Sequence, residues 1–321
     1  MGHEHRPLRS CRVAPAVRSV ATVTPTTASD SPLIDDFDVD QIGVWGDPST
    51  TEVTGDQIAA YAAATNDPHP WHLSGRQAPI VFAVVPTFTL MAERAMAPVP
   101  DHLMLRILHG EQDIRSHRPI VAGDRLTSRS RVVGIHGKSS GVVVTTAIET
   151  VDDTGAPVVS QSFAGFFRGG RWEPDAGEAF PEHALSPRVS ARPADFVVQQ
   201  RIDPDQTHRY AAASGDPMPI HTDDEFARAM GLPGIIAHGL CTMAFTSVGL
   251  VETVCPADPG RLSRLAVRFA GIARPGDQLS TRYFDLGAAG SDAAFGFTTM
   301  CGDDPVITDG LAVVRGQEAS T

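Results

Sequence analysis

Two closely similar stretches of this chain each place a carboxylate and an imidazole five residues apart. In "GDPMPIH", Asp216 precedes His221, and two prolines lie between them. Proline fixes φ at about −65°, so this segment is stiff and can hold both side chains in place. A carboxylate and an imidazole around one water molecule can act as a general acid and base pair. The alternative is that Asp216 only caps the following helix or stabilises a turn.

The second stretch shows that the chain contains an internal duplication. "YAAASGDPMPIH" begins at Tyr210, and the similar "YAAATNDPHPWH" begins 149 residues earlier at Tyr61 and contains Asp67 and His72. Three matched blocks in one order indicate a repeated unit. The other two pairs of matching segments are 78–90 with 232–245, and 117–133 with 273–284.

Each unit predicts the same elements around its Asp and His. A short helix contains the tyrosine, a proline-rich polar loop follows, and then comes a long apolar helix. The remainder consists of β-branched runs of roughly 8–12 residues separated by Gly, Pro and Asp, which is typical of an antiparallel meander. Helices and strands that are segregated in this way predict an α+β fold.

The predicted layout has four parts. Segment 171–195 is rich in proline, alanine and charge, as a linker would be. It separates a first unit at 35–170 from a second unit at 196–321. Residues 1–34 are expected to form a disordered extension, with a targeting peptide as the alternative.

Composition limits the classes of function. The net charge of −12 argues against nucleic acid as a partner, because phosphate binding requires a basic face. No run of roughly 18 apolar residues predicts a membrane span. The four cysteines lack metal or disulfide-framework spacing, which favours a reducing, cytoplasmic setting. No glycine-rich phosphate loop is present, and "HPWH" at 69–72 lacks a third ligand, so neither a cofactor nor a metal is expected.

The second unit resembles the MaoC-like, (R)-specific enoyl-thioester hydratases, also called hydratase 2. Their signature is a tyrosine, small residues, Ser/Thr-Gly-Asp-x-Asn-Pro-aliphatic-His, and later His-Gly before a helix. Met218 stands where that family has asparagine. The resemblance covers both units and implies a double hotdog, in which two antiparallel sheets each wrap around a long helix. The matching residues are Tyr210, Ser214, Gly215, Asp216, Pro219, Ile220, His221, His238 and Gly239.

The resemblance implies roles for these residues in adding water to a 2,3-unsaturated thioester. Asp216 and His221 would transfer the protons. Gly239 opens an apolar helix whose first N–H groups lack internal partners, so its N–H is the expected donor to the thioester oxygen; the alternative is a simple helix-start glycine. Other residues expected to contact the substrate or support its loop are Met218, His238 and Ser247.

The first unit keeps Asp67 and His72 but not the His-Gly pair. Val84 and Val85 align with His238 and Gly239, and a valine hinders close approach to its own N–H. This half is therefore expected to form a wall of the acyl tunnel, with Phe82 and Val85 facing an apolar chain. The alternative is that these are ordinary core residues.

The predicted function is a hydratase/dehydratase that interconverts 2-enoyl and (R)-3-hydroxyacyl thioesters of CoA or acyl carrier protein. One alternative is a non-catalytic acyl-thioester-binding or scaffold subunit, and another is a hotdog thioesterase. The expected assembly is a monomer that contains the pseudo-dimer, or a homodimer of such chains. Candidates for binding the carrier phosphates are Arg118, Arg131 and Arg168.

Overall fold

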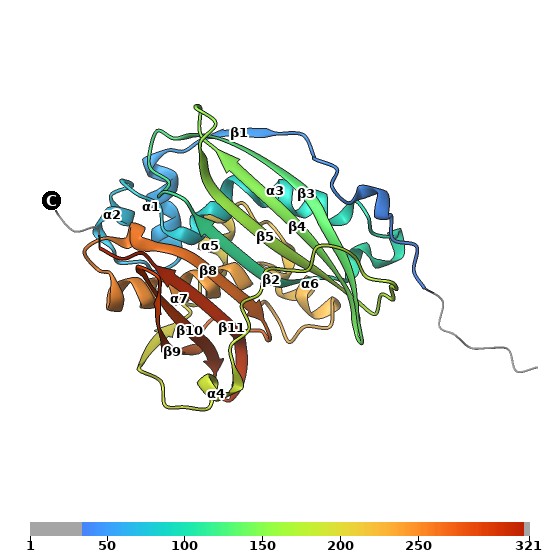
Figure 1. Ribbon diagram of the computed structural model, residues 1–321. Helices are drawn as coiled ribbons and strands as arrows, with labels where there is room; N and C mark the ends of the chain where they lie inside the picture. Colours follow the sequence, from blue (N-terminus) through green and yellow to red (C-terminus); the bar gives the residue numbers. More distant parts are fainter. Residues whose placement is uncertain (1–33, 318–321) are drawn as a thin grey trace, which may run out of the picture. The chain divides into compact units, whose positions relative to one another are not determined.

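The computed structural model describes residues 34–317 (Figure 1). The predicted N-terminal extension lies outside the described residues except for its last one. Each half begins with a short edge strand and helices and continues with an antiparallel meander, so the predicted α+β class is confirmed. In the described range no helix combines the length and the hydropathy that crossing a membrane requires.

The first half contains the elements predicted for one unit. Helix α1 begins in a capping box, in which the Thr54 side chain accepts from the Gln57 N–H and the Gln57 side chain accepts from the Thr54 N–H. Four long strands follow the helices. The elements are β1 (Ser49–Glu52), α1 (Gly55–Ala64), α2 (Pro70–Leu73), 3₁₀ helix η2 (Ile80–Thr87), α3 (Phe88–Met96), β2 (Ile107–Ser116), β3 (Arg125–Lys138), β4 (Gly141–Val151) and β5 (Pro157–Arg168).

The second half repeats this order, with one long helix at its centre. Twelve of the sixteen residues of α7 are buried, which is why its sequence is apolar on all sides. The elements are β7 (Phe196–Arg201), α5 (Gln206–Ser214), 3₁₀ helix η4 (Pro219–His221), α6 (Asp224–Ala229), α7 (Gly239–Val254), β8 (Leu262–Phe269), β9 (Gln278–Ala289), β10 (Asp292–Cys301) and β11 (Asp304–Val314).

The two meanders join edge to edge into one continuous sheet. The strand order is β1-β3-β4-β5-β2-β8-β11-β10-β9-β7, and β2 pairs antiparallel with β8 at the join. Figure 1 shows the green strands of the first half next to the orange and red strands of the second. Across this join Arg264 of β8 donates to the buried carboxylate of Asp113 on β2, at 2.8 Å. Both copies of the fold therefore belong to one core.

The copies also meet through their tyrosines. Tyr61 of α1 and Tyr210 of α5 are fully buried, and their hydroxyl oxygens lie 3.3 Å apart. Because the two residues occupy matching places in the repeat, this contact lies where the two units face each other. Tyr210 also packs beside the loop before α7, with its ring 4.8 Å from that of His238.

The first half differs from the prediction in its central helix. A long apolar helix was expected from residue 78, but the chain forms η2 and then α3. Pro86 lies inside η2 and has no N–H to donate, so a regular α-helix cannot continue through it. The helix of the first half is therefore broken where that of the second half is continuous.

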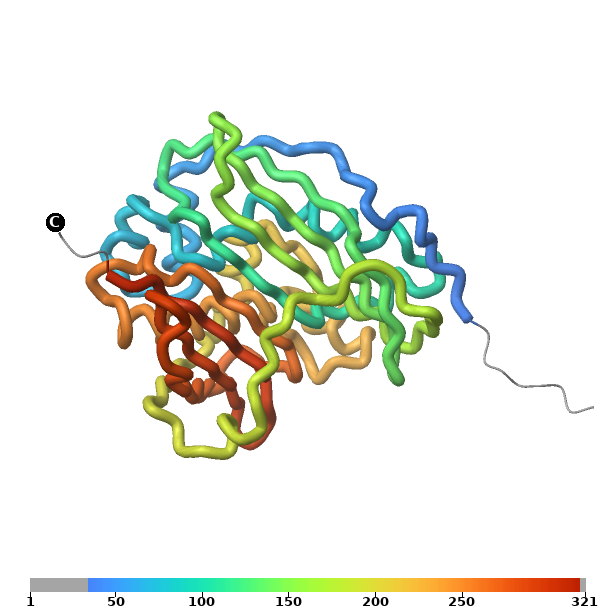
Figure 2. The backbone as a smooth tube through the Cα atoms, in the orientation of Figure 1, coloured from blue at the N-terminus to red at the C-terminus, as the bar shows by residue number. Residues whose placement is uncertain are grey.

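The segment predicted as a linker, 171–195, is attached to both halves. It contributes a short strand, β6 (Ala176–Gly177), which pairs with β3, and the single-turn helix α4 (Pro187–Ser190). Figure 2 shows it passing from the strands of the first half to those of the second. The buried His183 contacts Glu111 of β2 through Nε2 at 2.8 Å, and the Asp309 carbonyl through Nδ1 at 2.6 Å.

These contacts make the contribution of His183 to stability depend on pH. Burial alone would lower the pKa of His183, but hydrogen bonds to Glu111 and to the Asp309 carbonyl outweigh burial and raise it. A raised pKa means that the stabilisation is fully present below the ordinary histidine value of about 6.5 and is lost as pH rises through the folded pKa. We expect His183→Ala to cost roughly 1–3 kcal/mol of unfolding free energy at pH 6, and less at pH 9.

Thermal unfolding of both proteins at the two pH values measures this difference. His117→Ala is the matched control, because His117 is exposed and its Nε2 contacts only the hydroxyl of Ser160. A His183→Ala deficit that is the same at pH 6 and pH 9 would contradict the assignment of a charged imidazole.

Candidate active site

The loop that contains Asp216 and His221, the candidate catalytic loop, begins where α5 ends. Gly215 closes the helix in the left-handed conformation, with φ of 76°, which glycine adopts without steric cost. The chain then turns so that Asp216 is 8% exposed, and its Oδ1 accepts the N–H of Met218 at 3.1 Å. Within the described chain Oδ2 of Asp216 has no hydrogen-bond partner. One carboxylate oxygen thus holds the loop, and the other is available to a ligand.

His221 is held through its other ring nitrogen. Its Nδ1 contacts the carbonyl of Ile236 at 2.8 Å, and a carbonyl can only accept, so Nδ1 carries the proton. The Ile236 N–H in turn donates to the carbonyl of Ile220 at 3.2 Å. The neutral imidazole therefore has its lone pair on Nε2, which has no partner among residues 34–317. His221 is 8% exposed.

Three polar side chains converge at this point. Asp216, His221 and His238 each contribute one atom to a group in which all three atoms lie within 4.8 Å of one another. Such a set could hold a metal ion, but the rings of His221 and His238 are stacked face to face at 3.8 Å and 25°. Metal ligation uses the in-plane lone pair of each ring, and stacked rings do not direct these lone pairs to a common centre.

Burial shifts the pKa values of Asp216 and His221 in opposite directions. It raises the pKa of Asp216, although the Met218 N–H and the nearby His221 oppose the shift. It lowers the pKa of His221, against the Ile236 carbonyl and Asp216. The two values therefore move toward each other, which reduces the cost of passing a proton between these groups.

His238, the third polar side chain of this group, is neutral. It is 2% exposed, and neither ring nitrogen has a hydrogen-bond partner in the described part of the chain. Burial, together with the neighbouring His221, lowers its pKa to about 3. His238 thus stays uncharged at physiological pH and supports the face of the His221 ring, which fits the predicted support of the loop.

Gly239 stands at the first position of α7, after His238 as the N-cap. No side chain among residues 34–317 caps this end of the helix. The N–H groups of Cys241 and Thr242 donate to the His238 carbonyl, whereas the Gly239 N–H has no partner in that range and is available to a ligand oxygen. A Cβ at position 239 would lie 3.1 Å from the ring of Phe269, so packing also requires a small residue there. Sequence reasoning did not identify Phe269, because no motif marks a contact between a strand and a helix N-terminus.

Ser247 and Met218 lie in contrasting environments. Ser247 is 3% exposed in the middle of α7, and its hydroxyl donates to the Ala244 carbonyl of its own helix at 2.8 Å. Met218 is 46% exposed on the catalytic loop. Their predicted contacts with substrate stay predictions.

The first-half pair has the same residues and spacing but a different geometry. Oδ2 of Asp67 contacts Nδ1 of His72 directly at 2.7 Å, and Oδ1 accepts the His69 N–H. Both side chains are 3% exposed, and His72 Nε2 is buried without a partner in the described chain. In this half the carboxylate and Nδ1 of the imidazole contact each other, whereas in the second half the backbone holds Asp216 and His221 separately.

The predicted alignment of Val84 and Val85 with His238 and Gly239 does not hold in the structure. The first-half helix begins at Ile80, and Val84 is buried inside η2, away from a helix N-terminus. Phe82 is 1% exposed and packs edge-on against Tyr61 in the core. Phe82 therefore takes the core position that was its alternative.

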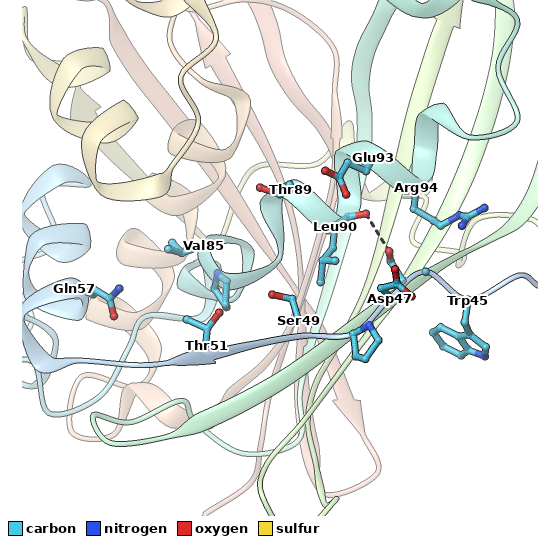
Figure 3. Close-up of a pocket in the computed structure, with 14 residues that line it drawn as sticks. Trp45, Asp47, Ser49, Thr51, Gln57, Val85, Thr89, Leu90, Glu93 and Arg94 are labelled. Carbon is cyan, nitrogen blue, oxygen red and sulfur yellow. Dashed lines mark hydrogen bonds between the residues drawn. The ribbon is translucent and has the colours of Figure 1, made fainter.

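Val85 borders a cavity of about 790 Å³ between η2, α3 and β1 (Figure 3). Eight of the fourteen lining residues are polar or charged, which differs from the apolar tunnel expected from the sequence. Figure 3 shows Glu93 and Thr89 of α3 on one side and Ser49 of β1 on the other. None of the lining residues comes from the second half.

The arginines predicted to bind carrier phosphates are engaged or lie elsewhere. Arg118 donates to Asp124 at 2.8 Å and to Asp152 at 3.3 Å. Arg131 of β3 stacks over the ring of Trp45. Arg168 is the last residue of β5, in the first half. None of the three lies on the second-half catalytic loop.

Family models match both halves of the chain. Residues 187–294 match the MaoC like domain, and residues 40–161 match the FAS1-like, dehydratase domain region. The chain is 30% identical to 3-hydroxyacyl-thioester dehydratase Y of Mycobacterium tuberculosis, over 66% of this chain and 77% of that protein. It is 27% identical to the probable enoyl-CoA hydratase 2 of Dictyostelium discoideum, over 66% of this chain and 71% of that protein.

Solved structures share the whole architecture. The MaoC-like dehydratase of Phytophthora capsici superposes with a TM-score of 0.76 at 25% identity, over 88% of this chain and all of that one. A Mycobacterium tuberculosis protein with a double hotdog fold gives a TM-score of 0.57 at 16% identity, over 86% and 96% of the two chains. The second match concerns the fold alone, and the predicted double hotdog is confirmed.

Proposed function

This chain is an enzyme of the MaoC-like hydratase and dehydratase family, and we propose that its chemistry on enoyl and 3-hydroxyacyl thioesters takes place at Asp216 and His221. The observation that carries this proposal is a pair of atoms without hydrogen-bond partners among the described residues, Asp216 Oδ2 and His221 Nε2. The backbone holds the opposite atom of each side chain, so both groups are oriented before a ligand arrives. Preorganisation of this kind is what a positioned acid and base require.

In the proposed hydration, one water molecule lies between Asp216 Oδ2 and His221 Nε2. The pair takes one proton from this water as its oxygen forms a bond to C3 of the enoyl thioester. The C2–C3 double bond supplies the electrons for the enolate, and the pair returns a proton to C2. The catalytic groups end in their starting state, and dehydration follows the reverse path.

The thioester oxygen gains charge during this step and needs donors. The N–H of Gly239 is the proposed donor, because it lies at an uncapped helix N-terminus directly after His238. The partial positive charge of the helix end adds to this stabilisation. Ser247 and Met218 are proposed to border the bound acyl thioester.

Paired assays on crotonyl-CoA test this function against its alternatives. A hydratase lowers the absorbance of the enoyl thioester without releasing free CoA, and its product is the (R)-3-hydroxy thioester. A thioesterase releases free CoA, and a scaffold protein does neither. Free CoA at the rate of substrate loss, or no substrate loss, would contradict the proposal.

The cavity beside Val85 is proposed to accept the distal part of the acyl group, which would give the first half the substrate-binding role predicted for Val85. We expect Val85→Trp to lower kcat/KM about tenfold or more on a dodecenoyl thioester, because the indole occupies the cavity. On a crotonyl thioester the change should be less than about twofold. Steady-state kinetics on the two substrates measure the contrast.

A tryptophan at an exposed position of the same half controls for nonspecific effects. Val121 is 38% exposed, so Val121→Trp should leave both substrates unaffected. Equal losses on long and short chains for Val85→Trp would contradict an acyl role for this cavity.

Each chain is proposed to work as a monomer. The two proposed units, 35–170 and 196–321 with the linker 171–195, already join through β2 and β8 and provide a paired hotdog. Light scattering of the purified protein distinguishes a monomer from the alternative homodimer. A cytoplasmic location is proposed from the cysteines, because the three that lie among residues 34–317, Cys241, Cys255 and Cys301, are free.

A further inference from the structure

A bulge in β2 turns His109 toward the interior, next to the join between the two halves. In a regular strand His109 and Gln112 would point to opposite faces, because their positions differ by three. The pairing of β2 with β5 shifts between His109 and Glu111, so Gly110 is an extra residue in β2 and both side chains lie on one face. From Glu111 onward β2 also pairs with β8 of the second half. The imidazole therefore belongs to the first half but lies beside the second.

Two phenylalanines from different halves contact the His109 ring. Its centroid lies 4.7 Å from that of Phe163 on β5 and 4.7 Å from that of Phe269 on β8, with interplanar angles of 72° and 66°. Aromatic rings prefer such edge-to-face arrangements. Phe269 in turn packs against the start of α7, where a Cβ at Gly239 would lie 3.1 Å from its ring. His109 thus contacts the ring that packs against the proposed donor to the thioester oxygen.

Hydrogen bonds determine which nitrogen of His109 carries the proton. Gln161 Nε2 donates to the Ala83 carbonyl at 3.0 Å, and a carbonyl can only accept, so the orientation of this amide is fixed. Gln161 Oε1 therefore accepts from Nε2 of Gln112 at 3.1 Å. Gln112 Oε1 accepts in turn from Nε2 of His109 at 3.1 Å, so Nε2 carries the hydrogen. The two buried glutamines thus connect His109 to the helix η2 that contains Ala83.

The His109 imidazole is neutral and serves as a packing element. Burial lowers the pKa of His109 to about 4, although the hydrogen bond to Gln112 and the Glu111 backbone oppose the shift. Its charge therefore does not change near neutral pH. A phenylalanine would also fill this space, but it would leave the Gln112 oxygen without the N–H that now reaches it.

We propose that His109 is a positioning residue, whose ring holds Phe269 against the start of α7 and thereby fixes the direction of the Gly239 N–H. This inference rests on the proposed function, because that N–H is the proposed donor to the thioester oxygen. Such a donor must be aligned before the charge develops, and a displacement of about 1 Å can lower the rate about a hundredfold. The first half thus contributes to the chemistry of the second without transferring a proton.

Two substitutions separate the ring of His109 from its N–H. His109→Gln keeps an N–H near the position of Nε2 but removes the ring, so it should lower kcat on crotonyl-CoA about 10–100-fold. His109→Phe keeps the ring contacts, so its kcat should stay within about threefold of the wild-type value. It should nevertheless lower the melting temperature, because Gln112 Oε1 becomes buried without its donor. KM should change little in both variants, since the oxyanion contact strengthens in the transition state.

His117→Gln is the matched control for these variants, because it makes the same substitution at an exposed position and should leave kcat unchanged. Equal kcat losses in His109→Gln and His109→Phe would overturn the role of the ring. The pH profile of kcat should keep its wild-type shape in both His109 variants. A shifted limb of that profile would overturn the positioning role in favour of direct proton transfer by His109.

A double-mutant cycle tests whether His109 acts through Phe269. Phe269→Leu removes the ring between His109 and the start of α7, and it should itself lower kcat. Once that ring is absent, adding His109→Gln should change kcat by less than about threefold. Losses that multiply would show independent effects and would overturn the proposal.

An NMR measurement separates this inference from the proposed function, because it requires no turnover. In protein labelled with ¹⁵N-glycine, the Gly239 amide signal is identified by its absence from the spectrum of Gly239→Ala. His109→Gln should shift this signal, whereas His109→Phe should leave it closer to its wild-type position. An inactive wild type with these shifts would contradict the proposed reaction but support the positioning role. An active wild type whose Gly239 signal is unchanged in His109→Gln would overturn the positioning role and leave the reaction intact.

Discussion

Asp216→Asn is expected to lower kcat by about 10²–10⁴, the usual contribution of a positioned acid or base. The amide is nearly isosteric with the carboxylate, and its oxygen can still accept the Met218 N–H, so the loop should keep its conformation. What the variant loses is the second carboxylate oxygen, Oδ2, which has no hydrogen-bond partner in the described chain and is proposed to transfer the proton. KM should change little, because the substituted atom is expected to interact with the transition state more strongly than with the bound substrate.

Assays of enoyl-CoA hydration at saturating substrate, which compare the kcat of the variant with that of the wild type, measure this loss. Melting temperatures of the variant and the wild type should agree, which shows that the fold survives. A variant that keeps more than about a tenth of the wild-type kcat would exclude Asp216 from proton transfer.

Gly239→Pro is expected to lower kcat by about 10²–10³, the usual effect of removing one oxyanion donor. Gly239 occupies the first position of α7, where helices tolerate proline because its missing N–H would be unpaired anyway. The preceding residue, His238, already has the extended conformation that proline requires, with φ of −62° and ψ of 134°. The substitution therefore removes the N–H and leaves the helix in place.

Gly239→Ala is the matched control for this substitution. Both variants place a Cβ about 3.1 Å from the Phe269 ring, so they share this contact, but alanine keeps the N–H. The difference in kcat between the two variants isolates the hydrogen bond. Equal activities would show that the Gly239 N–H does not face the thioester oxygen.

The sequence predicts the repeated units and the catalytic loop well because local signals mark them. Gly215, two prolines and the apolar run after Gly239 act within a few residues of their own positions, and the structure places α5, η4 and α7 accordingly. The α+β class follows from the same local patterns. Where short-range chemistry decides the conformation, the prediction and the structure agree.

Other features depend on contacts between distant residues and carry no local signal. The join of β2 with β8 requires two strands from different units to meet at their edges. No sequence motif marks His183, and only the fold brings it to Glu111 and the Asp309 carbonyl. Pro86 lies within the apolar run of the first half and interrupts the continuous helix that the run predicts.

The two Asp-His pairs show how identical spacing can produce different sites. His72 turns Nδ1 to the carboxylate of Asp67, whereas His221 turns Nδ1 to the carbonyl of Ile236. That carbonyl belongs to the loop before α7, which the first half does not reproduce. The spacing of five residues is shared, but the acceptor for Nδ1 decides whether the pair is closed or open to substrate.

The most direct test of a single working site is the ratio of the kcat losses of Asp67→Asn and Asp216→Asn on one enoyl-CoA. Because Asp67 and His72 contact each other, Asp67→Asn is expected to lower kcat less than about tenfold. Its main effect should be on stability, since it breaks a buried contact of 2.7 Å between Asp67 Oδ2 and His72 Nδ1. Asp216→Asn should lose about 10²–10⁴. Equal losses in the two variants, or the larger loss at Asp67, would contradict the assignment of the chemistry to the second half.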